Sequence, residues 1–207
     1  MRANRILLID VGVGNLQSVQ KALEHCGAQV LRSNKATELA KAWKIILPGV
    51  GAFGDFMDRL RGLGLEEALS EALDRGATLL GICVGMQAFF ETGEEMGHHL
   101  GLGLLKGKVL RFPDCNRIKI PHTGWNALNL RHPSPLFDHL SHPLYVYFNH
   151  SYYCEPLLNE NIMAETDHGI LFASAVGNEQ VFGVQFHPEK SQKVGLTILK
   201  NFLAWNP

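Results

Sequence analysis

The chain contains the stretch Thr78-Leu79-Leu80-Gly81-Ile82-Cys83-Val84-Gly85-Met86-Gln87. Its short apolar run, 79–82, is typical of a buried strand. The run leads into Cys83, which has Gly81 on one side and Gly85 on the other. This Gly-x-Cys-x-Gly pattern is the thiol counterpart of the Gly-x-Ser-x-Gly nucleophile elbow, a sharp turn that lifts a nucleophile above the edge of a sheet.

An apolar helical pattern follows Cys83 and continues through Met86, Phe89 and Phe90. Cys83 is therefore expected at a helix N-terminus, where unpaired N–H groups and the helix dipole favour the thiolate, the reactive form of cysteine. The flanking glycines would remove Cβ atoms that clash in so tight a turn. A second interpretation stays open at this point, in which Cys83 is one more small buried apolar residue.

The composition is that of an ordinary globular protein. With 207 residues, 46% apolar content and no linker or repeat, the sequence predicts a single domain over 1–207. The net charge of −1 gives no electrostatic basis for binding nucleic acid or an anionic membrane. The basic and apolar start of the chain is too short for a signal peptide and is typical of a first strand, and no run is long enough to span a bilayer.

Cysteine usage points to a reducing compartment. The four cysteines show no Cys-x-x-Cys spacing, so the sequence predicts neither a disulfide framework nor a metal site, and it favours the cytoplasm. These cysteines are Cys26, Cys83, Cys115 and Cys154.

The first half of the chain alternates strands and helices. Apolar runs at 6–9, 30–31 and 45–47 predict strands, and helical spacing is seen over 16–26, around 56–60 and over 65–73. This alternation predicts an α/β fold with an open, mostly parallel sheet and helices on both faces. Ligands bind such sheets at the carboxyl ends of the strands.

The second half is richer in strands. Strand patterns occur at 108–112, 125–130, 144–148 and 181–186, and a closing amphipathic helix is expected over 194–202. We expect these strands to continue the same sheet. The early turn Gly12-Val13-Gly14 lacks the third glycine of a dinucleotide fingerprint, since position 17 is glutamine.

A cysteine nucleophile needs a base, and the base needs a group that orients it. His187 follows a buried strand, Pro188 stiffens the turn, and Glu189 comes two residues later. Residues two apart in an extended segment point the same way, so the Glu189 carboxylate can reach the imidazole. In isolation His187 could be an ordinary loop histidine; together with the elbow, a Cys-His-Glu triad is the better interpretation.

Acyl transfer also needs donors for an oxyanion. One candidate is the backbone N–H of Val84, directly after the nucleophile. The other is the turn Pro48-Gly49-Val50-Gly51, whose glycines permit an N–H of Val50 or Gly51 to face the site. The pattern therefore indicates acyl transfer from an amide or ester.

These motifs resemble those of one family in order and spacing: Pro48-Gly49-Val50-Gly51, Gly81-Ile82-Cys83-Val84-Gly85-Met86-Gln87 and Phe186-His187-Pro188-Glu189. The family is the class I (triad-type) glutamine amidotransferases. The segments 10–18, 121–126 and 147–152 narrow the resemblance to glutaminase subunits of imidazole glycerol phosphate synthases, which serve histidine biosynthesis. It covers essentially the whole chain.

The resemblance implies a flavodoxin-like fold with a β-rich second half, and glutamine hydrolysis without a cofactor. It makes Cys83 the nucleophile, His187 the base and then the acid, and Glu189 the orienting group. Val50, Gly51 and Val84 match the family's oxyanion region. The positions that match residues beside the bound glutamine are Gln87, Glu95, His150, Ser151 and Tyr152.

The resemblance also implies a heterodimer. Ammonia would pass to a (β/α)₈-barrel synthase (cyclase) subunit, which makes imidazole glycerol phosphate and an aminoimidazole carboxamide ribotide. Asn15, Trp125, Tyr147 and Lys190 match positions that face this partner. Their alternative interpretations are a helix cap, two core aromatics and a solvated lysine.

The sequence departs from the family pattern at Val11, Val13, Val84 and Asn149. Val84 leaves the backbone donor intact. The other three leave open a paralogous glutaminase that supplies ammonia for surface-polysaccharide synthesis. A related cysteine hydrolase or protease, and a binding subunit with an inactive triad, are further alternatives.

Overall fold

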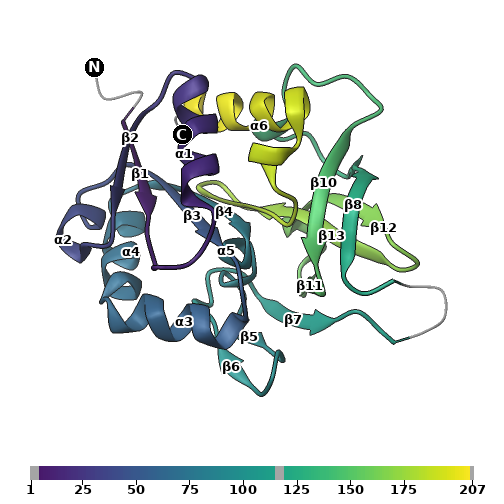
Figure 1. Ribbon diagram of the computed structural model, residues 1–207, viewed down its shortest axis with the longest axis horizontal. Helices are drawn as coiled ribbons and strands as arrows, with labels where there is room; N and C mark the ends of the chain where they lie inside the picture. The colour runs from purple at the N-terminus through teal and green to yellow at the C-terminus, as the bar shows by residue number, and fades with distance from the viewer. Residues whose placement is uncertain (1–4, 115–118, 206–207) are drawn as a thin grey trace.

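The computed structural model describes residues 5–114 and 119–205. An open sheet runs through the described part of the molecule, with helices on both of its faces (Figure 1). Its first part consists of parallel neighbours in the order β2-β1-β3-β4-β14. These strands are β1 (Arg5–Ile9), β2 (Gln29–Ser33), β3 (Lys44–Gly49), β4 (Thr78–Cys83) and β14 (Val181–Val184).

Helices bury both faces of this parallel part. α1 and α6 contact each other on one face, and α2, α3 and α4 lie together on the other (Figure 1). Every residue of β3 and β4 is buried, as expected for apolar strands without alternation. The predicted α/β fold is confirmed. The helices are α1 (Leu16–His25), α2 (Ala36–Leu39), α3 (Phe53–Gly62), α4 (Leu65–Asp74), α5 (Val84–Gln87) and α6 (Gln192–Ala204).

Beyond β14 the sheet becomes mainly antiparallel, in the order β13-β11-β7-β5-β6. The predicted β-rich second half is thus present. Its strands are β5 (Thr92–Gly93), β6 (His99–Leu100), β7 (Gly107–Arg111), β9 (Asn129–Leu130), β11 (Tyr152–Pro156), β12 (Ile162–Asp167) and β13 (Leu171–Gly177). Single 3₁₀ turns occur at η1 (Pro135–Phe137), η2 (Asn159–Asn161) and η3 (Pro188–Lys190).

The expectation that all late strands continue one sheet is wrong for two of them. β8 (His122–Ala127) and β10 (Tyr145–His150) form a separate antiparallel pair. The outer edge of β10 is occupied by the turn after β14: the His187 N–H donates to the Tyr147 carbonyl at 2.9 Å, and the Tyr147 N–H donates to Ser191 Oγ at 3.0 Å. With this edge filled, no strand of the main sheet can pair with it.

The helix after Cys83 is also shorter than predicted, because α5 ends at Gln87. The N–H groups of Leu102 and Leu105 donate to the carbonyls of Ala88 and Phe89 at 2.8 and 2.9 Å. A longer helix would need those carbonyls for its own hydrogen bonds. Phe89 and Phe90 are fully buried all the same.

The carboxyl ends of β3, β4 and β14 lie side by side, since these strands are parallel neighbours. Cys83 ends β4, and the turns at Val50 and His187 follow β3 and β14. The sheet therefore brings the three predicted motifs together at one edge. None of the helices in 5–114 and 119–205 is both long and apolar enough to cross a membrane.

Candidate active site

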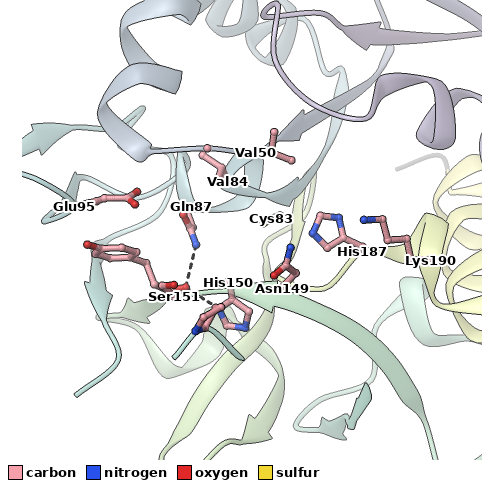
Figure 2. Close-up of a pocket in the computed structure, with 13 residues that line it drawn as sticks. Val50, Cys83, Val84, Gln87, Glu95, Asn149, His150, Ser151, His187 and Lys190 are labelled. Carbon is pink, nitrogen blue, oxygen red and sulfur yellow. Dashed lines mark hydrogen bonds between the residues drawn. The ribbon is translucent and has the colours of Figure 1, made fainter. Parts of the chain in front are cut away.

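A cavity of about 330 Å³ opens at this sheet edge. Figure 2 shows Glu95 and Gln87 on one side of Cys83, with His187 and Lys190 on the other. All five predicted glutamine-binding side chains line the cavity, and so do the predicted oxyanion residues. The complete lining is Val50, Gly51, Cys83, Val84, Gln87, Glu95, Pro121, Asn149, His150, Ser151, Tyr152, His187 and Lys190.

Cys83 sits in a strained backbone conformation, with φ 56° and ψ −114°. A positive φ is rare for a residue with a Cβ, and such strain is concentrated at functional sites. The glycines beside it allow the turn. A Cβ on Gly85 would collide with the Leu47 carbonyl oxygen of β3, and one on Gly81 would lie 2.6 Å from the Gly85 carbonyl oxygen. The predicted elbow geometry is therefore present.

His187 and Glu189 form a buried pair beside Cys83. Nδ1 of His187 donates to Glu189 Oε1 at 3.0 Å, and the side chains are only 8% and 3% exposed. His187 also hydrogen-bonds Cys83. Burial works to lower the pKa of His187, but the hydrogen bonds to Cys83 and Glu189 and the charges of both groups outweigh it and raise the pKa to about 10. His187 is therefore an imidazolium near neutral pH.

The turn after β3 lines the same cavity through Val50 and Gly51. Gly51 has φ +90°, and a Cβ there would meet nothing within 4 Å, so it is the backbone conformation rather than space that calls for glycine. Val84 is the first residue of α5, so its N–H has no partner within the helix. Both stretches face the cavity that contains Cys83.

Gln87 and His150 are held by the protein itself. Gln87 Nε2 donates to the Tyr152 carbonyl at 3.1 Å and to Gln185 Oε1 at 3.0 Å. His150 Nδ1 donates to the same Tyr152 carbonyl at 2.8 Å, which leaves Nε2 to accept from His122 Nδ1 at 3.0 Å. The Gln87 and His150 side chains are therefore held in place by hydrogen bonds within the protein, and both form part of the cavity wall.

His150 and its hydrogen-bond partner His122 are both neutral near pH 7. Burial is the main cause that lowers the pKa of His150 to about 3 and that of His122 to about 4. His122 Nε2 is then free to accept from Asn126 Nδ2 at 3.3 Å. The Tyr152 carbonyl can only accept, so His150 must carry its proton on Nδ1. His150 Nε2 must then accept, so His122 must carry its proton on Nδ1.

Glu95 lines the cavity and also contacts the helix beside it. Its Oε2 accepts from the Phe53 N–H at 2.7 Å, at the start of α3. A carboxylate in this position is suited to bind an ammonium group. Ser151 and Tyr152 line the same cavity and follow His150 in the sequence.

The four predicted partner-facing residues differ in their surroundings. Asn15 caps α1, since its side chain accepts from the Ser18 N–H at 3.3 Å, as the alternative interpretation predicted. The core interpretation is wrong for Trp125, which is 48% exposed. Trp125 and Tyr147 stack edge to face with ring centres 6.1 Å apart, and Lys190 Nζ lies 5.8 Å from the centre of the Tyr147 ring.

Three residues of the site were missed as site residues. Pro121 and Asn149 line the cavity, and Asn149 had been noted only as a departure from the family pattern. Gln185 lies behind the cavity, and its Nε2 is 3.6 Å from Cys83 Sγ. A signal for Gln185 was available: it is two residues before His187, on the same side of an extended segment.

Two further cysteines lie within the described residues. Cys26 and Cys154 are free thiols, and burial raises the pKa of both, that of Cys154 well above its ordinary value. Cys115 lies outside the described residues. Within 5–114 and 119–205, no group of three or more His, Cys, Asp or Glu side chains is placed to hold a metal ion.

Known proteins resemble this chain along nearly its whole length. The subunit HisH of imidazole glycerol phosphate synthase from Syntrophotalea carbinolica is 45% identical over 202 residues, which cover 95% of this chain and 98% of that protein. HisH from Bacillus subtilis is 46% identical over 199 residues, covering 94% and 93% of the two chains.

Solved structures support the fold. A crystal structure of a glutamine amidotransferase aligns with a TM-score of 0.75 at 18% identity and covers 96% of this chain and 98% of that one. A chain of PurLQS from Thermotoga maritima also has a TM-score of 0.75, at 20% identity, with 97% and 98% covered. The family model "Glutamine amidotransferase class-I" matches residues 7–205. The resemblance inferred from the motifs is confirmed, and the chain belongs to the class-I glutamine amidotransferase family.

Proposed function

We propose that the chain is the glutaminase subunit of an imidazole glycerol phosphate synthase. The observation that carries this proposal is a strained Cys83 that hydrogen-bonds a buried His187–Glu189 pair, inside a cavity lined by the side chains expected for glutamine. Relatives from several bacteria share this subunit name at about 45% identity. They favour the histidine pathway over a polysaccharide-pathway paralogue or a general cysteine hydrolase.

The chemistry follows from the arrangement of the triad. The Cys83 thiolate attacks the side-chain amide carbon of glutamine, and the oxyanion is stabilised by N–H groups of Val84 and of the Val50–Gly51 turn. The His187 imidazolium gives its proton to the leaving nitrogen, so that ammonia departs and a glutamyl thioester remains. Water then attacks the thioester with His187 as base, and the Cys83 thiolate leaves. This step releases glutamate and returns His187 to the imidazolium.

Recognition of glutamine uses charge and shape. The Glu95 carboxylate is placed to bind the ammonium group of the substrate, and hydroxyl and N–H donors at Ser151 and Tyr152 suit its carboxylate. Gln87 and His150 fix the wall between these ends through their hydrogen bonds to the Tyr152 carbonyl. The reaction needs no cofactor or metal.

The ammonia passes to a synthase partner, proposed to be a (β/α)₈-barrel cyclase subunit that forms a heterodimer with this chain. Trp125, which is 48% exposed, Tyr147 and Lys190 make one cluster, and Lys190 also lines the cavity. This cluster suits a docking surface for that partner. Asn15 can reach the partner with the polar end of its side chain while it caps α1.

The proposal treats 1–207 as one glutaminase domain. A single buried core connects the parallel and antiparallel parts of the sheet, and the family model spans 7–205. We propose that the reaction takes place in the cytoplasm, because free cysteines such as Cys26, Cys83 and Cys154 are typical of a reducing compartment.

The test is to mix the purified chain with a barrel synthase subunit of the histidine pathway. Glutamate release and formation of imidazole glycerol phosphate from glutamine are measured together. The proposal predicts both, in equal amounts, and predicts that free ammonia replaces glutamine as nitrogen source. Glutamate release without imidazole glycerol phosphate would instead assign the chain to another acceptor, and peptide cleavage without glutamate release would indicate a hydrolase.

Glutamine hydrolysis is expected to rise when the synthase subunit binds. Gly14 lies against the oxyanion turn, since a Cβ there would be 3.7 Å from Val50 Cγ2, and Asn15 is the next residue. A partner that contacts Asn15 can therefore bias the conformation of the Val50–Gly51 peptide. If the competent turn is populated at about 1% in the free chain, the rate rises by up to about 100-fold. Steady-state glutaminase assays with and without the partner measure this ratio, and equal rates would contradict the switch.

Replacement of Glu189 with glutamine is expected to lower the pKa of His187 and to reduce kcat about 10²-fold, because the carboxylate charge that stabilises the imidazolium is lost. Histidine NMR titration and glutaminase assays of the complex measure the two effects. The raised pKa means that the His187 interactions add stability below about pH 6.5 and lose it as pH rises through about 10. The difference in free energy of unfolding between wild type and E189Q should therefore narrow as the pH rises from about 6.5 to about 10.

The control for E189Q is E155Q, which removes a carboxylate from an exposed surface pair with Lys108. It should leave both kcat and the His187 titration unchanged. An unaltered His187 titration in E189Q would show that Glu189 does not set the charge of the ring.

A further inference from the structure

We infer that Gln185 is a further catalytic residue, whose side-chain amide donates a hydrogen bond to the reacting sulfur of Cys83. The inference rests on the proposed role of Cys83 as nucleophile. Gln185 Nε2 lies 3.6 Å from Cys83 Sγ, within the range of an N–H to sulfur hydrogen bond. The thiolate would then have two side-chain donors, His187 and Gln185.

The hydrogen-bond network determines which end of the Gln185 amide faces the sulfur. The Tyr152 backbone carbonyl can only accept, so the Gln87 atom that faces it at 3.1 Å must be the NH₂ group. The same NH₂ group faces the other amide at 3.0 Å, so that atom of Gln185 must be its oxygen. The Gln185 NH₂ group is therefore the end directed at Cys83.

Gln185 cannot easily turn away from this contact. The residue has no exposed surface, and its backbone N–H donates to the Ser174 carbonyl at 2.9 Å. Gln87, which holds the amide oxygen, is 2% exposed and is itself held by Tyr152. The donor is thus fixed before the substrate arrives, which is the condition under which electrostatic stabilisation is most effective.

The charge on sulfur decides how much this contact contributes. A thiolate is a strong acceptor and a thiol a weak one, so a fixed N–H donor favours the charged, nucleophilic form. The same donor holds the sulfur in one position as it attacks the amide carbon. Hydrogen bonds to charged groups typically change an equilibrium by about 10- to 100-fold.

The experiment replaces Gln185 with methionine, which keeps the length of the side chain but has no N–H group. In the complex with the synthase subunit, kcat and KM for glutamine are measured. The rate of Cys83 alkylation by iodoacetamide is followed against pH by peptide mass spectrometry. We expect kcat to fall about 10- to 100-fold with KM unchanged. The acidic limb of the alkylation profile should move up by about one pH unit.

The matched control is S174A. Ser174 lies on the neighbouring strand, is fully buried, and its Oγ has no hydrogen-bond partner among the described residues. This control removes a buried polar atom near Gln185 without touching the sulfur, and it should keep the wild-type kcat and alkylation profile. If Q185M does not fold, Q185L, which also lacks the donor, is used for the same measurements.

Two outcomes overturn the inference. One is a wild-type alkylation profile and kcat in Q185M or Q185L. The other is a raised KM with an unchanged alkylation profile, which would mean that Gln185 acts only by holding Gln87 against the substrate. A wild-type complex that releases no glutamate would instead overturn the proposed function. The alkylation profile of Cys83 would still test the sulfur contact in that case.

Discussion

Glutaminase activity of the complex is expected to fall by about 10⁴-fold or more when Cys83 is replaced with alanine, because removing the nucleophile of a triad eliminates the covalent route altogether. The side chain is small and the backbone strain at φ 56° is the same for alanine, so the fold should be kept. The substitution also removes a hydrogen bond and a charge that raise the pKa of His187, and histidine NMR should show that pKa falling from about 10.

The control for C83A is C26A. Cys26 is a partly buried thiol at the end of α1, and its Sγ lies 3.5 Å from the Leu196 carbonyl oxygen. Cys26 does not line the cavity that contains Cys83. C26A should retain wild-type glutamine turnover. A diazoketone analogue of glutamine should modify a single peptide of the wild-type chain, the one containing Cys83, and none in C83A. Substantial turnover in C83A, or labelling elsewhere, would contradict the nucleophile assignment.

The synthase subunit provides a second check on the same variant. Since free ammonia does not need the triad, the complex with C83A should still form imidazole glycerol phosphate from ammonia. Loss of this ammonia-dependent activity would show that the substitution disturbs assembly rather than chemistry. The two nitrogen sources thus separate a chemical effect from a structural one.

The parallel half of the fold could be predicted because its sequence signals are local. Apolar runs such as 6–9 and 79–82 are buried on both faces, and helices separate them at regular spacing. The closeness of Cys83 to the His187–Glu189 pair could be predicted because His187 and Glu189 are neighbours in sequence and Cys83 lies in a glycine-flanked turn. The 3.0 Å hydrogen bond between His187 Nδ1 and Glu189 Oε1 joins residues only two positions apart. The parallel sheet then places this pair beside Cys83.

The features that the sequence did not reveal depend on contacts between distant segments. The length of α5 is limited by N–H groups at 102 and 105, and the edge of β10 is closed by residues 187–191. Trp125 has a large apolar side chain of the kind found in protein cores. Its strand, β8, belongs to the small separate pair, and the side chain is exposed there. Periodicity carries no information on such pairings.

The contact between Gln185 and Cys83 spans 102 positions of the chain. Gln185 could have been noticed as a polar residue inside the predicted apolar strand at 181–186, where burial demands a hydrogen-bond partner. The sequence could not say which partner. It is the parallel pairing of β14 with β4 that places the end of one strand beside the end of the other.

Replacement of Gly85 with alanine is expected to lower the free energy of unfolding by about 3 kcal/mol or more, and to abolish activity in whatever protein folds. A Cβ at this position would overlap the Leu47 carbonyl oxygen and lie 2.9 Å from the Leu47 carbonyl carbon. Both atoms belong to the backbone of β3, which is buried along its whole length, so no side-chain rotation relieves the overlap.

The collision also bears on the chemistry. To accept the new methyl group, α5 must move away from β3, and Cys83 and the Val84 N–H move with it. The oxyanion turn begins where β3 ends, so the distance between its two sets of donors would increase. A displacement of about 1 Å in such a site can reduce the rate about 10²-fold. Activity should therefore fall by more than the loss of folded protein explains.

G62A is the matched control, because Gly62 is also in a helix and a Cβ there would meet nothing within 4 Å. It should leave activity unchanged and raise stability by up to about 1 kcal/mol, since alanine loses less backbone entropy on folding. Urea unfolding followed by circular dichroism compares the two variants with wild type. If G85A unfolded at the wild-type midpoint, α5 could not be packed directly on β3. Gly85 would then be needed only for the turn at Cys83. The explanation that close packing of α5 on β3 fixes the nucleophile relative to the oxyanion donors would be wrong.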